Sequence, residues 1–179
     1  MKLFIDSSQK VFAAALMDDN YKVLDSEILK TKFKVESIVG FLKKQKNIQQ
    51  IDEIYVNIGP GSFTGSRSSL LYIRTLAQIN SKIKIFQTTT FNILKAQSRW
   101  VIFKRKKMFI EATKTKSYCW VNEEIKLVEK SKKEKEINYK HLINHFANYK
   151  NIFQEISVDQ LKPLYASNPQ IGAQKSWKF

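Results

Sequence analysis

The stretch NIGPGSFTGSR, residues 57–67, constrains the fold of this chain more than any other segment. It holds three of the five glycines in the sequence. Ahead of it, Ile54, Val56 and Ile58 recur at every second position and share one face of an expected strand. Behind it, residues 64–79 have apolar side chains at helical spacing. The stretch is therefore predicted to turn a strand directly into a helix.

A glycine loop between a strand and a helix presents free backbone N–H groups, which can bind an anion. The specific phosphate-binding signatures are absent from this loop. No pair of its glycines has the Walker A spacing with a following lysine, and Thr64 stands where the dinucleotide fingerprint needs its third glycine. No carboxylate lies nearby in the sequence to hold magnesium. The residues therefore favour a conformationally demanding turn over phosphate catalysis.

Such a turn makes demands on particular positions. Pro60 fixes one dihedral, Gly61 and Gly65 are free to adopt positive φ, and Thr64 is a candidate N-cap of the helix. The predicted structural glycine loop comprises Gly59, Pro60, Gly61, Ser62, Phe63, Thr64, Gly65 and Arg67.

The hydrophobic pattern of the first half alternates between short strands and amphipathic helices. Turn-forming residues separate the first three strands, which predicts an antiparallel meander. The expected order β-β-β-α-β-α-β is that of an α/β, ribonuclease-H-like domain, which also occurs in the lobes of actin-like and Hsp70-like (ASKHA) ATPases. The ranges are strands 2–6, 10–17 and 21–29, helix 34–46, strand 52–58, helix 64–79, strand 82–88 and helix 90–97.

After about residue 97 the signals weaken. Residues 100–114 and 117–130 are interpreted as strands joined by turns, and residues 131–150 as a charged helix with a modest apolar face. The chain is accordingly divided into a first ASKHA-like lobe, residues 1–97, and a reduced second lobe with a C-terminal tail, residues 98–179.

The formal net charge of +15 raises the question of a nucleic-acid partner. The lysines are spread along the whole chain, and the densest run, KRKK at residues 104–107, is short. A general coding bias therefore explains the charge better than a dedicated nucleic-acid surface does. A stand-alone basic RNA-binding module is kept as an alternative.

Three features bear on the cellular compartment. No stretch approaches the roughly 20 apolar residues of a membrane span. The opening MKLFIDSSQK meets charge too early for a signal peptide, and Cys119 is the single cysteine. No internal disulfide can form, and a cytoplasmic protein without a membrane partner is expected.

The helix expected after the glycine loop carries more apolar surface than one sheet face would cover. A helix packed on a sheet needs an apolar arc somewhat over about 100° wide, whereas the apolar residues of the helix after the glycine loop span roughly half its circumference. The surplus favours a second apolar contact, either within the chain or with a partner. On this helix the residues expected at such an interface are Ser69, Leu70, Ile73, Leu76 and Ala77.

The other candidate sites carry weaker signals. His141 and His145 are four residues apart on an expected helix, a spacing that suits zinc, yet the HExxH pattern and a third ligand are missing. Asp6, Ser7 and Ser8, at the end of the first strand, are weak candidates for nucleotide binding. No nucleophile, base and orienting group come together. No catalytic residue, no metal and no cofactor is therefore predicted.

GPGSFTGSR, residues 59–67, is nearly the whole signature GPGSFTGxR of the bacterial TsaB (YeaZ) family. The similarity extends outward on both sides. LFIDSSQKVFAAAL resembles the opening segment of the family, IDEIYVNI the strand before the loop, and IKIFQTTTFNILKA the segment after the helix. LKPLYA, residues 161–166, resembles a late element of the family with Pro and Tyr. The chain thus resembles the family over residues 1–97 and patchily beyond.

The resemblance implies a two-lobed member of the actin/Hsp70-like superfamily that has lost its own catalytic equipment. TsaB proteins pair with a TsaD protein, which transfers a threonylcarbamoyl group to the adenosine beside the anticodon of tRNA, and a TsaE ATPase joins the complex. The implied role is a non-catalytic activator of a TsaD-like protein. Contact with TsaD, or with a second copy of the chain, would run through helices of the first lobe, and tRNA would be met only within the complex. The resemblance thereby adds a second helix to the expected interface, with the residues Val35, Ile38, Val39 and Leu42.

The sequence departs from the family in its second half. Where the family has a segment similar to DARrgEvY, this chain has FKRKKMFI, which retains only Arg105. The chain is also shorter than typical members, and Leu71 and Ile73 replace small residues after Arg67. A reduced second lobe and an altered partner surface are therefore expected. The alternative within the same superfamily is a residual nucleotide-binding or nucleotide-hydrolysing protein.

Overall fold

The computed structural model describes residues 1–98 and 107–165 of the chain. Its main layer is a six-stranded sheet with the strand order β3-β2-β1-β4-β5-β9. β1, β2 and β3 form an antiparallel meander, β4 and β5 run parallel to β1, and β9 pairs antiparallel with β5. The bounds are β1 (Lys2–Asp6), β2 (Val11–Met17), β3 (Val23–Lys30), β4 (Glu53–Asn57), β5 (Lys84–Thr88) and β9 (Gln154–Ile156).

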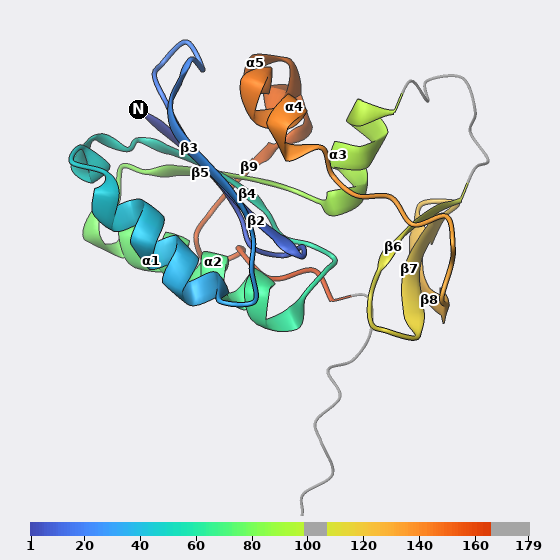
Figure 1. Cartoon of the computed structure of the whole chain (residues 1–179). Helices are drawn as coiled ribbons and strands as arrows, with labels where there is room; N and C mark the ends of the chain where they lie inside the picture. The colour runs from blue at the N-terminus through green and yellow to red at the C-terminus, as the bar shows by residue number, and fades with distance from the viewer. Residues whose placement is uncertain (99–106, 166–179) are drawn as a thin grey trace, which may run out of the picture.

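Helices cover both faces of this sheet (Figure 1). α1 (Lys34–Lys44) and α2 (Phe63–Ile79) lie side by side on one face. On the other face lie α3 (Thr90–Gln97), α4 (Tyr139–Asn144) and α5 (Phe146–Tyr149). Short 3₁₀ turns occupy Ile48–Gln50 and Lys150–Ile152. No helix in the described residues is long and apolar enough to cross a membrane.

A separate antiparallel sheet of three strands lies beyond one end of the main sheet (Figure 1). It consists of β6 (Met108–Glu111), β7 (Lys116–Val121) and β8 (Glu124–Glu129). Met108 and Ile110 of β6 are buried in the same cluster as side chains of α3 and α4. The small sheet is therefore attached to the main core by apolar packing.

Successive side chains of the central strands point to opposite faces of the sheet, which divides the core into two clusters. Leu3 and Ile5 of β1 pack with Ile38 of α1 and Leu70 of α2 in one cluster. Phe4, between them in the sequence, belongs to the other cluster, where aromatic rings of β4, α5 and the segment before β9 meet. Alternate residues of β1 thus contribute apolar side chains to the core on both faces of the sheet.

The mixed α/β class and the order β-β-β-α-β-α-β expected for the first half are confirmed. The expected common face of Ile54, Val56 and Ile58 is confirmed too, because all three lie in the α1–α2 cluster. The boundary between residues 97 and 98 stays a prediction, since residues 99–106, including Arg105, lie outside the described residues. After β8 the chain returns to the main sheet through α4, α5 and β9.

The prediction of a charged helix over residues 131–150 is wrong for the first half of that range. Regular helix begins only at Tyr139, with Asn138 as N-cap accepting a hydrogen bond from the His141 amide at 3.0 Å. Just before it, the Lys135 amide donates to the Phe109 carbonyl at 2.7 Å, beside a parallel bridge between Phe109 and Glu134. Tertiary pairing with β6 therefore overrides the helix propensity of the lysine-rich segment.

Candidate functional site

The glycine loop between β4 and α2 is pressed against the turn between β1 and β2. The Ser62 amide donates to the Ser8 carbonyl at 2.5 Å, and the Ser7 hydroxyl donates to the Gly65 carbonyl at 2.5 Å. A Cβ atom at Gly61 would overlap the carbonyl oxygen of Ser8, and one at Gly65 would overlap that of Ser7. Glycine is required at both positions because two backbone segments meet without room for a side chain.

Two details of the loop differ from expectation. Gly61 and Gly65 are not in the positive-φ region; Gly59 is, with a φ of 105°. The N-cap of α2 is Ser62 and not Thr64, because the Ser62 hydroxyl accepts a hydrogen bond from the Gly65 amide at 3.2 Å. Thr64 lies instead inside the first turn, which begins at Phe63.

The carboxylate of Asp6 is fully buried beside this loop, and each of its oxygens accepts two hydrogen bonds. One oxygen accepts from the amide and the hydroxyl of Ser8, both at 2.7 Å. The other accepts from the Asn57 side-chain amide and the Tyr139 hydroxyl, both at 2.7 Å. Burial raises the pKa of Asp6, while these hydrogen bonds act in the opposite direction. Asp6 thus joins β1, β4 and α4.

These contacts limit what the loop can do chemically. The space between Gly61, Gly65 and the β1–β2 turn is too small for a methyl group, so it has no room for a phosphate. Asp6, Ser7 and Ser8, the candidates for nucleotide binding, are all fully buried. Their polar atoms hold the loop and α4 in place, which is a structural task.

The C-terminal segment closes the other side of the loop. The Leu164 amide donates to the Ile58 carbonyl at 2.8 Å. Tyr165 packs against Phe63 with ring centroids 5.1 Å apart, and its hydroxyl accepts from the Arg67 guanidinium at 2.9 Å. The Arg67 guanidinium also lies 4.2 Å from the centre of the Phe63 ring. The loop residues Phe63 and Arg67 therefore bind Tyr165 of the same chain. The sequence did not reveal this role, because Tyr165 lies far from both residues along the chain.

Solved structures share the fold of this chain. "YeaZ from Pseudomonas aeruginosa" aligns with a TM-score of 0.63 and 15% sequence identity, over 92% of this chain and 98% of that one. An uncharacterized protein from the same organism, described as similar to peptidase YeaZ, aligns with a TM-score of 0.60 and 16% identity, over 93% of this chain and 99% of that one. The chain has a YeaZ-like fold. No model of a protein family matches the sequence, and no curated protein matches it.

The YeaZ-like fold buries most of the residues expected at a partner interface. Leu70 and Ile73 are almost completely buried in the chain's own core. Ile38, Leu42 and Ser69 are buried as well, whereas Val39, Leu76 and Ala77 are half-buried and Val35 is exposed. The helical spacing of these residues predicted that they would be covered by apolar neighbours. For most of them the neighbours belong to the chain's own sheet and not to a partner.

Two large apolar residues that remain exposed on α2 were not among the residues predicted at the interface. Leu71 of α2 is 65% exposed and Ile79 is 78% exposed. They lie eight residues apart, which places them on one side of the helix. Val35 and Val39 of α1 are four residues apart and also share a side. Val39, Leu71 and Ile79 together are called the docking face below, whereas Val35 lines a cleft at the start of α1. A burial estimate from the helical wheel would have separated Leu71 from Leu70.

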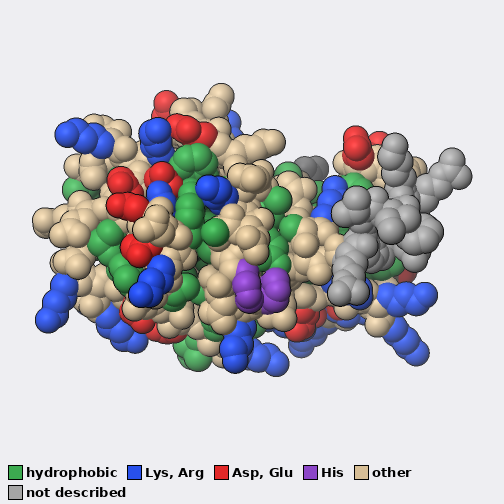
Figure 2. Space-filling view, turned by 90° about the horizontal axis from the view of Figure 1, so that it is seen from above, with side chains coloured by type: hydrophobic (Ala, Val, Ile, Leu, Met, Phe, Trp, Pro, Cys, Tyr) green, Lys and Arg blue, Asp and Glu red, His purple; other side chains and the backbone are tan. Residues whose placement is uncertain are grey.

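The two histidines lie side by side on the surface seen in Figure 2. Their rings stack with centroids 4.5 Å apart, and Nδ1 of His141 is 2.7 Å from the Tyr149 hydroxyl. Within residues 1–98 and 107–165, no three His, Cys, Asp or Glu side chains are grouped so that they could hold a metal ion. Hydrogen bonding and stacking therefore account for the placement of His141.

Proposed function

We propose that this protein is a non-catalytic subunit that binds and activates a TsaD-like protein during threonylcarbamoyl transfer to the tRNA adenosine beside the anticodon. The YeaZ-like fold and the GPGSFTGSR loop support the proposal. The observation that carries it is the internal use of the loop: protein atoms fill the space next to Gly61 and Gly65, and the Asp6 carboxylate is occupied by four hydrogen bonds.

The docking face would provide the contact with TsaD. Leu71 is a large apolar side chain that is 65% exposed, and α1 and α2 lie side by side on one face of the sheet (Figure 1). Burying such a side chain in an interface stabilises a complex through the hydrophobic effect. A second copy of the chain could occupy the same surface when TsaD is absent.

The remaining parts of the proposal concern the rest of the complex. The small sheet of β6, β7 and β8 would be the reduced second lobe, and a TsaE-like ATPase would join the pair in the cytoplasm. The isolated chain is expected to bind ATP weakly or not at all and to hydrolyse none, because Asp6 is not available to a nucleotide or to magnesium. Hydrolysis by the purified chain would favour the residual-nucleotidase alternative.

The test is co-purification of the tagged chain with the TsaD-like protein of its own organism. Leu71→Glu places a charge on the docking face and is expected to weaken the complex about tenfold or more. Leu24→Glu is the matched control, because Leu24 is also exposed but lies on the edge strand β3. The complex should survive Leu24→Glu and should support threonylcarbamoyl transfer to tRNA. Failure of the unmodified chain to bind the TsaD-like protein would overturn the proposal.

A further inference from the structure

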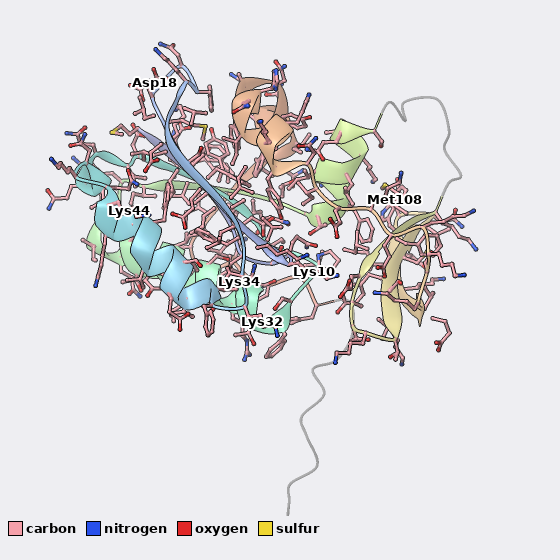
Figure 3. The ribbon with its side chains drawn as sticks, viewed as in Figure 1. Lys10, Asp18, Lys32, Lys34, Lys44 and Met108 are labelled. Carbon is pink, nitrogen blue, oxygen red and sulfur yellow. The ribbon has the colours of Figure 1, made fainter. Side chains whose placement is uncertain are left out.

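A cleft of about 1130 Å³ lies at the end of the sheet where β3 leads into α1. Its walls are the β1–β2 turn, the β3–α1 connection, the start of α2 and the end of β6. The charged side chains that line it are Lys10, Lys30, Lys32, Lys34, Glu36 and Glu111. Figure 3 shows Lys10, Lys32 and Lys34 together at this end of the molecule.

The cleft carries a surplus of positive charge. Glu111 forms ion pairs with Lys10 and with Lys130, so this carboxylate is already compensated. Lys30 and Lys32 have no carboxylate within 4.0 Å in the part of the chain that the structure describes. Two lysines are therefore free to bind an anion that enters the cleft.

Lys34 adds a buried cation to the same wall. Its side chain is almost completely buried, and its ammonium donates to the Lys10 carbonyl at 2.7 Å. Among the described residues no carboxylate lies within ion-pair distance of it. A buried charge without a partner is costly. Burial lowers the pKa of Lys34 to about 8, although the charge of Asp6 raises it. An anion in the cleft would relieve this cost.

The lysines also occupy an unfavourable place for a helix. Lys32 and Lys34 flank the start of α1, where the helix dipole is positive and cations are destabilising. The N-cap itself is Phe33, which makes no side-chain capping bond and is 68% exposed in the cleft. Ser, Thr, Asp or Asn would stabilise this position by accepting a hydrogen bond from a backbone amide of the first turn. Residues that break a local rule without a structural gain are expected at binding sites.

We propose that this cleft binds a phosphate-bearing segment of RNA. Lys30 and Lys32 hold the backbone phosphates, and buried Lys34 adds positive charge to the wall behind them. The exposed ring of Phe33 stacks on a base, and lysines with a stacking ring are the combination by which proteins bind single-stranded nucleic acid. The net charge of +15 extends the attraction well beyond the cleft, which favours a polyanion over a free nucleotide. The inference extends the proposed function by giving this subunit its own RNA contact, and it is tested without TsaD.

The experiment is fluorescence anisotropy with a labelled tRNA transcript at several salt concentrations. The double variant Lys30→Gln and Lys32→Gln should bind about tenfold more weakly, with a salt slope lower by roughly 1.4 to 1.8. The matched control is Lys132→Gln with Lys133→Gln, which removes two exposed lysines before α4 and should change affinity less than about twofold. Phe33→Ala should weaken binding of an unstructured RNA about tenfold. Thermal melting checks that each variant is folded.

Three outcomes would overturn the inference: no RNA binding by the unmodified chain, equal losses in the cleft and control variants, or binding of ATP or inorganic phosphate in the cleft without binding of RNA. Equal losses would mean diffuse attraction to the whole basic surface. The double cleft variant should still co-purify with the TsaD-like protein, since neither lysine lies on the docking face. A failure of RNA binding is therefore distinguishable from a failure of the proposed function.

Discussion

At the scale of single residues, Gly65 faces the Ser7 carbonyl across a gap that leaves no space for a Cβ atom. Gly65→Val should destabilise the fold by about 3 kcal/mol or more, because overpacking here displaces backbone and not a flexible side chain. Gly40→Ala is the matched control, since a Cβ at Gly40 meets no atom within 4 Å, and it should stabilise α1 by up to about 1 kcal/mol. Denaturant unfolding measures both. Equal stability of the two variants would contradict the close approach.

Lys34 gives a second prediction at this scale, in the pH dependence of stability. Burial lowers its pKa to about 8 from an ordinary 10.5. Between these values the unfolded chain holds a proton that the folded chain lacks, so the free energy of unfolding should rise as the pH rises through this window. Lys34→Met should remove that rise, whereas Lys43→Met, an exposed lysine of the same helix, should keep it. Parallel profiles for the wild type and Lys34→Met would show that Lys34 is not buried as described.

At the scale of elements, α2 has two apolar sides with different tasks. Ile73 is buried against the sheet, whereas Leu71, two residues earlier, points to solvent. Ile73→Glu should prevent stable folding, because an unpaired carboxylate would enter the core. Leu71→Glu should leave the melting temperature almost unchanged while weakening TsaD binding. Thermal melting of the two variants separates these effects, and a large loss of stability in Leu71→Glu would place this side chain in the core.

At the scale of the whole molecule, the end of the described chain closes the face of the sheet that α1 and α2 cover. Leu161 is fully buried in their cluster, and its carbonyl accepts from the Arg74 guanidinium at 2.6 Å. Leu161→Ala should therefore cost about 2–5 kcal/mol of stability, as in other cores. Leu24→Ala, at an exposed position of β3, should cost less than about 0.5 kcal/mol. Similar midpoints in denaturant for both variants would contradict a structural role of this segment.

Across the whole molecule, sequence patterns were enough to assign the helices and strands of the first half but not the conformation of residues 131–138. The first half follows local rules: alternation in β1 and β4, helical spacing in α1 and α2, and turn residues between strands, so each element could be assigned from its own residues. Residues 131–138 follow no such rule, because Glu134 and Lys135 pair with Phe109 of β6 in place of forming a helix. Partners distant in sequence leave no periodic signal.

The candidate site, too, could be predicted from the sequence only in part. The glycine loop was identified from its residues, but the reason for Gly61 and Gly65 lies in Ser7 and Ser8, more than fifty residues earlier. Two helices were predicted to carry a partner interface, yet Leu70 and Ile73 of that prediction are buried in the chain's own core. Helical spacing gives the direction of an apolar side chain and does not say whether the chain or a partner covers it.

The sequence by itself determined the alternating strands, the two amphipathic helices and the strand-to-helix turn, because these depend on side chains close together along the chain. Only the tertiary structure decided that the Asp6 carboxylate is occupied by Ser8, Asn57 and Tyr139, and that four lysines line one cleft. Those contacts join separate elements, and the packing of the sheet against its helices sets their distances. The lack of room for a phosphate between Gly61, Gly65 and the β1–β2 turn is a consequence of that packing.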